Sequence, residues 1–401
     1  MNRAHASHST VERRFWHGGA GPANEGGVSE NPKTSETPAE KLRYKSTRAL
    51  RVGFVPLIDS APLIMAQELG LFRKYGIKVE LKRELGWATV RDKILFRELD
   101  GAQALAGMPL AATLGLGSVP CECVTGLVLN LHGNAITLSK ELWERGVRDA
   151  RSFKREIEDK RSKRVYTLGV VFPFSTHNFI LRDWLISGGI DPDRDVRLVV
   201  VPAPAMFQNL LLGNLDGYCV GEPWNSLAVQ SGLGWCPATT AQLAPLHPEK
   251  VFMVRRDFAA EHEDEHLALL AALYEACQHC DKTANRAEMV ATLARKQYLN
   301  VDPDLLKTSL ISPTFDLGFG RTEFQPDFHV FFRNETNDPS EDKASWVLKQ
   351  FRSHKLVPDP SALRVNAGWN VFRSDLFQKT KRLVDEPSRH ETTEAIEPLC
   401  R

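Results

Sequence analysis

The chain has 401 residues, of which 42% are hydrophobic and 25% are charged, and its formal net charge is +1 at pH 7. This length suits two domains of ordinary size, and the composition is typical of a soluble globular protein. A charge so close to zero provides no global field for nucleic acid or for an anionic membrane, so any preference for anions must be local. No apolar run is long enough to span a bilayer.

The N-terminal segment, residues 1–47, is polar and rich in Gly, Ser, Pro and Glu, which predicts a disordered tail. It lacks the apolar core of a secretory signal, and the residues after Arg13 and Arg14 are too polar for export. The seven cysteines are dispersed, which indicates reduced thiols in a cytoplasm. Cys277 and Cys280 fall inside a helical pattern, which favours two ordinary cysteines over a redox or metal site.

Strand and helix patterns alternate through the first third of the sequence. In chain order we expect a strand at 49–55, a helix at 61–76, a strand at 77–84, a helix, a turn and a short strand within 92–107, a helix at 108–118 and a buried strand at 121–132.

A second series follows a charged surface helix expected at 140–164. It comprises a strand at 167–172, a helix beginning near Ser175, a strand at 196–202, a helix at 204–214, strands at 218–223 and 251–258, helices at 262–284 and 286–298, a loop-rich stretch at 315–324, a helix near 340–353 and a polar tail from about 359. This alternation predicts an α/β fold with largely parallel sheets, in two lobes separated by a cleft. Ligands of such folds bind beyond the carboxyl ends of the strands, often between domains.

His177 carries the most specific local signal for a ligand. Ser175 and Thr176 are good N-cap residues, so His177 falls in the first turn of a helix, where unpaired N–H groups and the helix dipole favour an anion. The same dipole disfavours a protonated imidazole, unless a bound anion compensates. A histidine satisfied by neighbouring polar groups is the alternative interpretation.

Four further residues are candidates, each with a structural alternative. Trp87 follows a strand and could offer its indole N–H or simply fill the core. Asn134 ends an apolar run and could donate an amide or form a turn. Gly221 would allow the backbone to approach a ligand, although Pro223 also suits a turn. Lys250, before a strand at a predicted hinge, is either solvated or directed into a closing cleft.

No catalytic set accompanies these residues. The sequence contains no nucleophile elbow, zinc-protease motif, Walker A motif or dinucleotide fingerprint in the required context. The glycine-rich segment 113–118 suggests phosphate binding only weakly. We therefore expect a binding protein rather than an enzyme, with no cofactor and no metal.

Four segments together resemble the nitrate- and bicarbonate-binding family of solute-binding proteins. They are VGFVPLIDSAPLIMAQELGLFRKYGIKVEL, GWATVRDK, VFPFSTHNFILRDWLISGGIDP and GYCVGEPWN. The resemblance covers about residues 48–358 and implies a bilobed α/β fold of the type II periplasmic-binding-protein kind, which closes on a small anion. The implied organisation is a disordered tail at 1–47, lobe I at 48–135 and 250–358, lobe II at 136–249 and a C-terminal tail at 359–401.

The resemblance also implies the ligand-binding residues. Nitrate-binding members hold the anion with a tryptophan, a histidine, a glycine backbone and a lysine, which fall here on Trp87, His177, Gly221 and Lys250. Their glutamine corresponds to Asn134, which keeps the amide but is shorter by a methylene. Bicarbonate-binding relatives have an acidic residue around the lysine position, so Lys250 favours nitrate or nitrite. A Lys250→Glu variant should then lose nitrate without unfolding, as expected of a lysine at a surface hinge.

The family includes a cytoplasmic branch. This sequence resembles that branch because it shows no secretory signal, no lipoprotein cysteine and no membrane span. Its members are nitrate/nitrite sensors that hold an RNA-binding antitermination protein inactive until the anion binds. The resemblance thus implies this regulator as partner, with no direct contact to nucleic acid or membrane. The alternative is the substrate-binding component of a nitrate or bicarbonate importer. A third reading, a relative of the bilobed thiamine-pyrimidine synthases, would need a histidine- and cysteine-rich active region and a pyridoxal phosphate lysine that we cannot place.

Overall fold

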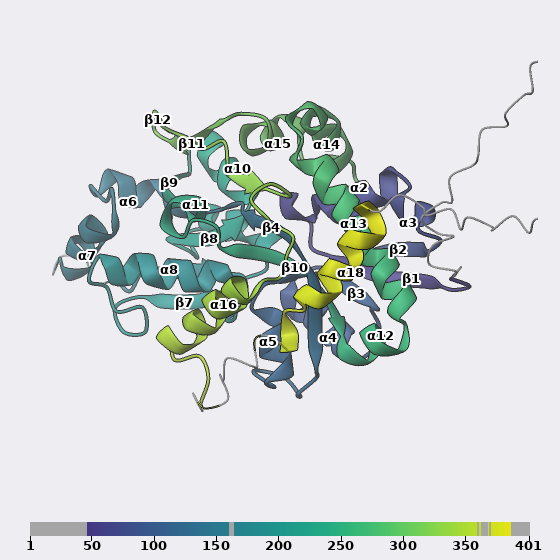
Figure 1. Ribbon diagram of the computed structural model, residues 1–401. Coiled ribbons are helices and arrows are strands. Elements are labelled where there is room, and N and C mark those ends of the chain that lie inside the picture. The colour runs from purple at the N-terminus through teal and green to yellow at the C-terminus, as the bar shows by residue number, and fades with distance from the viewer. Residues whose placement is uncertain (1–45, 160–163, 359–360, 362–367, 369, 386–401) are drawn as a thin grey trace, which may run out of the picture. The chain divides into compact units, whose positions relative to one another are not determined.

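The computed structural model describes residues 46–159, 164–358, 361, 368 and 370–385, all within one compact unit at 36–401. The predicted disordered tail at 1–47 lies almost entirely outside the described residues. The described part contains two β-sheets flanked by helices (Figure 1). The α/β fold class predicted from the sequence is therefore confirmed.

The first sheet has six strands. In spatial order they are β13 (His329–Val330), β4 (Cys123–His132), β10 (Pro248–Arg255), β3 (Gly101–Leu105), β1 (Ala49–Phe54) and β2 (Lys78–Arg83). The second sheet has five strands, in the order β7 (Arg197–Val200), β6 (Thr167–Val170), β8 (Gly217–Gly221), β5 (Asn134–Ser139) and β9 (Gly234–Thr239). The lobe boundaries given by the sequence stay a prediction.

Both sheets are mixed, whereas the sequence predicted largely parallel ones. The pairs β1–β2, β1–β3, β6–β7 and β6–β8 are parallel, as successive strand–helix–strand units require. Strands β10 and β5 run antiparallel to both of their neighbours on either side. The reason is the chain path, because β5 and β10 are the first strands that the chain forms after passing from one sheet to the other.

Helices cover both sheets. Those of the first half are α2 (Ala61–Glu68), α3 (Leu71–Lys74), α4 (Trp87–Leu95), α5 (Met108–Thr113), α6 (Lys140–Glu144), α7 (Ala150–Glu158) and α8 (Thr176–Ser187). Those of the second half are α9 (Met206–Leu211), α10 (Trp224–Gln230), α11 (Thr240–Leu243), α12 (Arg256–Glu261), α13 (Glu263–Asp281), α14 (Arg286–Leu293), α15 (Pro303–Leu310), α16 (Glu341–Ser353) and α18 (Ser374–Asp385).

One buried apolar cluster joins the two sheets and forms the surroundings of the site. It contains Trp87 and Val251 from the side of the first sheet, and Phe179 and Val220 from the side of the second. A separate core lies between the first sheet and the helices α2 and α13. Because the shared cluster excludes water between the sheets, polar side chains placed there cost free energy unless they contact a partner or a ligand.

Two elements differ from the sequence-based expectation. The stretch expected to be loop-rich forms an antiparallel hairpin of β11 (Thr314–Gly318) and β12 (Arg321–Phe324). It packs on the second sheet, where Phe315 lies in a small cluster with Cys236 of β9. The expected polar tail contains α18, which lies against α13 (Figure 1).

Cys277 and Cys280 lie in α13 and are fully buried, as expected of ordinary helix cysteines. Among the described residues there is no group of three His, Cys, Asp or Glu side chains suited to a metal ion. No helix in that part of the chain is both long and apolar enough to cross a membrane.

Candidate functional site

Two of the predicted site residues, Asn134 and Lys250, lie where the chain passes from one sheet to the other. The first passage runs from β4 to β5 through His132 and Gly133, which have φ values of 59° and 91°. A Cβ at Gly133 would lie 2.5 Å from the ring of His329, so only glycine fits this turn. Asn134 then begins β5 and pairs directly with Gly221, the last residue of β8.

The start of α8 brings His177 to the same place. Ser175 is the N-cap, and its hydroxyl accepts a hydrogen bond from the backbone N–H of Asn178 at 3.1 Å. His177 is fully buried, and neither ring nitrogen has a hydrogen-bond partner among the described residues. Burial lowers the pKa of His177 to about 3, although the nearby Glu249 carboxylate favours the charged ring. The imidazole is thus neutral at physiological pH.

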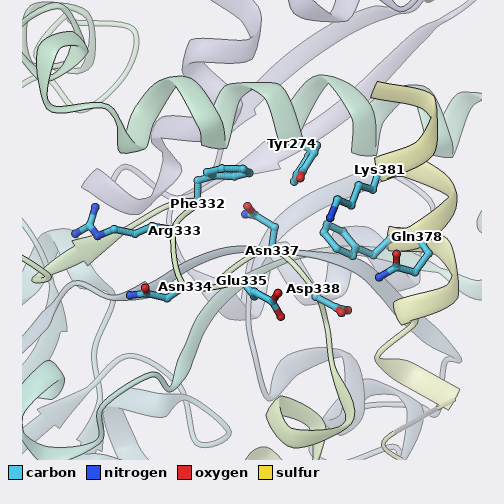
Figure 2. Close-up of a pocket in the computed structure, with 10 residues that line it drawn as sticks. Tyr274, Phe332, Arg333, Asn334, Glu335, Asn337, Asp338, Gln378 and Lys381 are labelled. Carbon is cyan, nitrogen blue, oxygen red and sulfur yellow. The ribbon is translucent and has the colours of Figure 1, made fainter. Parts of the chain in front are cut away.

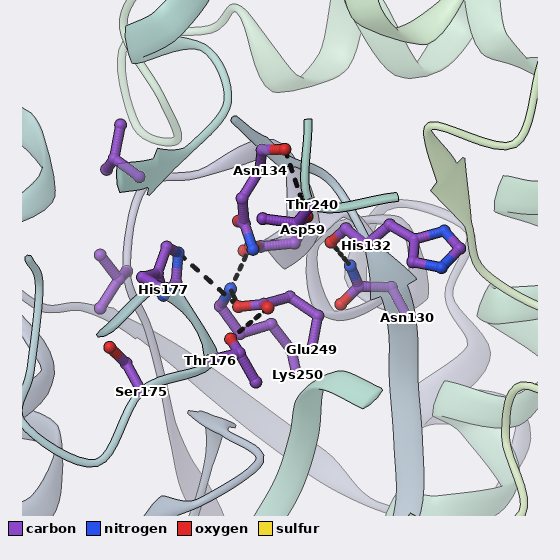
Figure 3. A network of polar contacts seen from close by, with 12 residues as sticks. Asp59, Asn130, His132, Asn134, Ser175, Thr176, His177, Thr240, Glu249 and Lys250 are labelled. Carbon is purple, nitrogen blue, oxygen red and sulfur yellow. Dashed lines mark hydrogen bonds and ion pairs between the residues drawn. The ribbon is translucent and has the colours of Figure 1, made fainter. Parts of the chain in front are cut away.

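Lys250 lies at the centre of the site and is fully buried, which corrects the expectation of a lysine at a surface hinge. Its Nζ lies 2.6 Å from Oδ2 of Asp59 and 2.7 Å from Oε1 of Glu249 (Figure 3). Burial disfavours the charged ammonium, but the two carboxylates outweigh burial and raise the pKa of Lys250. The ammonium also lies 5.4 Å from the centroid of the Trp87 ring.

Glu249 is a buried carboxylate that the sequence did not place in the site. It accepts a hydrogen bond from the hydroxyl of Thr176, and its Oε2 lies 3.3 Å from Nε2 of His247. Its Oε1 lies 3.6 Å from Nε2 of His177 (Figure 3). Burial alone would raise the pKa of Glu249, yet Lys250 and the two histidines hold it well below the ordinary value.

Asp59 is the second residue that sequence reasoning missed. It lies in the short 3-10 turn Ile58–Ser60, directly before α2, and Gln103 of β3 donates a hydrogen bond to its Oδ1. Burial raises the pKa of Asp59 although Lys250 opposes that shift. The signal that could have revealed Asp59 was its position in VGFVPLIDSAP, one of the four segments that carry the family resemblance.

The other predicted residues present unsatisfied polar atoms. Trp87 is 1% exposed and Asn134 is fully buried. Nε1 of Trp87 and both amide atoms of Asn134 have no hydrogen-bond partner among the described residues. A Cβ at Gly221 would lie 3.2 Å from Oδ1 of Asn134 and 3.3 Å from Oδ2 of Asp59, so the glycine keeps the backbone close to both groups.

These unpartnered groups lie around Lys250 and its two carboxylate partners. A buried donor or acceptor without a partner costs about 1–3 kcal/mol, and native proteins rarely leave several together. Trp87 and Asn134 can each donate an N–H there, and His177 can donate one only from a protonated ring nitrogen that does not face Glu249. The arrangement can therefore hold a small ligand with several hydrogen-bond acceptors.

Comparison with known proteins places the chain in a family. The sequence profile of the NMT1-like family matches residues 44–294, more than half of the chain. The chain belongs to the NMT1-like family. It is 32% identical over 367 residues to the nitrate/nitrite binding protein NrtA of Nostoc sp., covering 89% of this chain and 81% of that protein. It is 30% identical over 368 residues to the bicarbonate-binding protein CmpA of Synechococcus elongatus, covering 85% and 79%.

A further relative of this NMT1-like chain is the nitrate import ATP-binding protein NrtC of Synechocystis sp., 40% identical over 340 residues. That match covers 84% of this chain and 50% of NrtC, so the chain spans about half the length of this relative. The crystal structure of the periplasmic nitrate-binding protein NrtA from Synechocystis superposes with a TM-score of 0.80 at 28% identity, covering 84% of this chain and 89% of that one.

The alkanesulfonate-binding protein SsuA of Xanthomonas axonopodis pv. citri shares the fold at 14% identity, with a TM-score of 0.60, covering 83% of this chain and 98% of that one. These likenesses confirm the periplasmic-binding-protein-like fold and the resemblance to nitrate- and bicarbonate-binding proteins. By their names, the NrtA and CmpA relatives bind solutes, which agrees with the expectation of a binding protein.

Proposed function

We propose that the site around Lys250 binds nitrate or nitrite. The observation that carries this proposal is the set of buried N–H-bearing side chains, Trp87, Asn134 and His177, whose polar atoms lack partners in the described structure. Nitrate is planar and weakly basic, and its oxygens can accept one hydrogen bond from each of several separate donors. The names of the NrtA relatives support the same ligand class.

The charges in the site bear on which anion is preferred. The ammonium of Lys250 is shared between Asp59 and Glu249, so the site does not offer an uncompensated cation. Affinity must then come largely from directed N–H groups, which suits a weakly hydrated anion such as nitrate. The Glu249 carboxylate could instead accept the O–H of bicarbonate, the ligand named for the CmpA relative.

Calorimetric titration with nitrate, nitrite and bicarbonate separates these ligands. We expect heat of binding with nitrate or nitrite and a weaker response to bicarbonate. Chloride serves as the control for a nonspecific charge effect, because it is an anion without the planar arrangement of three oxygens. Binding of bicarbonate alone would overturn the assignment and would make Glu249 the residue that selects the ligand.

We further propose that the chain is a cytoplasmic sensor that controls an RNA-binding transcription antitermination regulator of nitrate assimilation. Binding of the anion would favour the closed arrangement of the sheets, and the regulator would bind that arrangement less tightly. By linkage, the regulator must then lower the affinity for nitrate by the same factor. The burial of Trp87, His177 and Lys250 supports a site that opens and closes around its ligand.

The second candidate is the substrate-binding part of a nitrate or bicarbonate importer. It is favoured by the names of the NrtA, CmpA and NrtC relatives, although this chain spans only half of NrtC. Two measurements distinguish the roles, namely copurification of the regulator with and without nitrate, and fractionation of cells that express the full chain. A complex with the regulator that persists unchanged at saturating nitrate and nitrite, or a chain found outside the cytoplasm, would contradict the sensor.

A further inference from the structure

A cavity lies apart from the anion site, where α13 and α18 meet the segment 331–338 (Figure 2). Its volume is about 260 Å³, and none of its lining residues belongs to the anion site. It is therefore a place where a different small molecule could bind without competing for Lys250. The chemistry of its walls defines what that molecule would be.

One wall of the cavity is aromatic. Tyr274 of α13 packs against Phe332, with ring centroids 5.6 Å apart, and against Phe377 of α18, with ring centroids 5.5 Å apart. Tyr274 and Phe377 are both buried. Aromatic rings attract a cation that lies near their faces, and they exclude water from around it.

Asn337 supplies a buried acceptor at the cavity. The side chain is 2% exposed, and its Nδ2 donates hydrogen bonds to the carbonyl oxygens of Val128 at 2.8 Å and Phe331 at 2.9 Å. Those two bonds fix the orientation of the amide, and its Oδ1 has no partner among the described residues. Figure 2 shows this amide between Phe332 and Tyr274. An oxygen so placed requires a donor to offset its desolvation.

The backbone that carries the polar side chains is held in an unusual conformation. Asn334 and Glu335 have φ values of 60° and 51°, a region that glutamate rarely adopts. The ammonium of Lys343 holds this turn by donating to the carbonyl oxygens of Glu335 at 2.8 Å and Asp338 at 2.7 Å. The turn places both acidic side chains at the cavity.

The lining carries charges of both signs. Arg333 is engaged by ion pairs with Asp281 at 2.9 Å and Asp327 at 2.7 Å. The other charged residues of the lining are Glu335, Asp338 and Lys381 of α18, and Oδ1 of Asp338 accepts a hydrogen bond from the Ser374 hydroxyl at 2.7 Å. Two carboxylates and a buried amide oxygen suit an ammonium group, whereas Lys381 suits a carboxylate.

We propose that this cavity binds a free amino acid. Its ammonium would bind near Oδ1 of Asn337 and the carboxylates of Glu335 and Asp338, against the aromatic wall, and its carboxylate would face Lys381. The volume of about 260 Å³ accommodates a molecule of this size. The site is independent of the proposed anion site, so either proposal can fail without the other.

The test is calorimetric titration of the full chain with L-alanine, L-glutamine and L-arginine, with propionate and propylammonium as probes that each lack one charge. We expect at least one amino acid to bind and each single-charge probe to bind at least about tenfold more weakly, because a charged hydrogen bond is worth about 1.5–3 kcal/mol. No heat from any amino acid at millimolar concentration would overturn the proposal.

Variants then locate the binding. Lys381→Ala and Glu335→Gln should each weaken the amino acid by about tenfold, and Gln378→Trp should fill the cavity and abolish binding. Lys379→Ala is the matched control, since Lys379 is also exposed on α18 but pairs with Glu263 outside the cavity. These residues are exposed or on the cavity wall, and nitrate affinity should be the same in every variant. Equal amino-acid affinity in Lys381→Ala, Glu335→Gln and Lys379→Ala would show that the ligand binds elsewhere.

Discussion

Replacing Lys250 by methionine tests the electrostatic description of the site most directly. Methionine keeps most of the volume of lysine and removes its charge, so packing changes little and the change in stability reports the ion pairs. Lys250 is fully buried, and its ammonium contacts both Asp59 and Glu249. The variant therefore leaves two buried carboxylates without their cation.

The expected loss of stability follows from the cost of an uncompensated buried charge. Removing one partner of a buried ion pair typically destabilises a protein by about 3–5 kcal/mol. Asp59 limits the loss, because burial already raises its pKa and it can take up a proton when Lys250 is absent. Glu249 carries most of the effect, since its pKa lies well below the ordinary value in the intact site. A loss of about 3 kcal/mol is a large part of a typical free energy of unfolding of about 5–15 kcal/mol.

Urea denaturation followed by tryptophan fluorescence measures this loss. Lys250→Met should lower the free energy of unfolding by about 3 kcal/mol, and adding Glu249→Gln should restore much of it by removing the orphaned charge. Lys349→Met on the exposed face of α16 is the matched control and should change stability by less than about 0.5 kcal/mol. A loss below about 1 kcal/mol in Lys250→Met, or no recovery in the double variant, would refute the buried charge network.

Two further predictions concern the same site, and a third concerns buried histidines across the fold. Trp87→Phe removes the indole N–H, which has no partner in the described structure, so nitrate affinity should fall about tenfold. Because Trp87 is buried, the smaller ring also leaves a cavity that should lower the free energy of unfolding. Titration and denaturation of the same sample measure both effects, and Trp143→Phe is the control that should keep its nitrate affinity. Gly221→Ala places a Cβ 3.2 Å from Oδ1 of Asn134 and 3.3 Å from Oδ2 of Asp59, so it should weaken nitrate binding far more than it lowers stability. The same two methods measure both effects, and an unchanged nitrate affinity would remove Gly221 from the site. Stability should also depend on acid, because burial lowers the pKa of four histidines, namely His132, His177, His266 and His329. Below about pH 6.5 the unfolded chain binds these protons and the folded chain does not, so stability should fall as the pH drops from about 6.5 to about 5. Burial raises the pKa of Glu222 to about 7, and this single group opposes the four histidines. Denaturation midpoints that stay constant over this range would contradict the prediction.

The positions of Trp87, His177 and Gly221 could be predicted from the sequence because each follows a local rule. Trp87 is the first residue of α4 after a strand, His177 lies in the first turn of α8 after a serine cap, and Gly221 ends a strand. Local patterns of this kind depend on a few neighbouring residues. They place a residue at the correct end of an element even when the tertiary structure is unknown.

The acidic half of the site could not be predicted in this way. In a regular strand Glu249 and Lys250 would point to opposite faces of the sheet, so only one of them would reach the site. The pairing of β10 with β4 shifts register on both sides of Lys250, and this irregularity lets the two side chains contact each other. Asp59 joins them through a contact between residues far apart in sequence, which no local pattern contains.

The hairpin β11–β12 was missed for a related reason, since Gly318 and Gly320 are typical of loops, although their positive φ values form the tight turn of this hairpin.

The orientation of His177 links the acidic half of the site to anion binding. Its Nε2 faces Oε1 of Glu249 at 3.6 Å, so the carboxylate favours a proton on that nitrogen. The neutral ring then carries a lone pair on Nδ1, which can accept but not donate. An anion that contacts Nδ1 therefore requires a second proton on the ring, and that proton also compensates the charge of the anion.

We accordingly expect nitrate binding to take up a proton. In the free site burial keeps the pKa of His177 at about 3, and a bound anion would raise it, so affinity should increase as pH falls below the pKa of the complex. Calorimetry at pH 6.5 in two buffers with different ionisation enthalpies measures the protons taken up, and His177→Asn is the control that should take up none. Equal binding heats in both buffers for the unmodified chain would mean that His177 stays neutral. The anion would then be held by Trp87, Asn134 and the shared ammonium of Lys250 alone, and its affinity would not depend on the titration of this histidine.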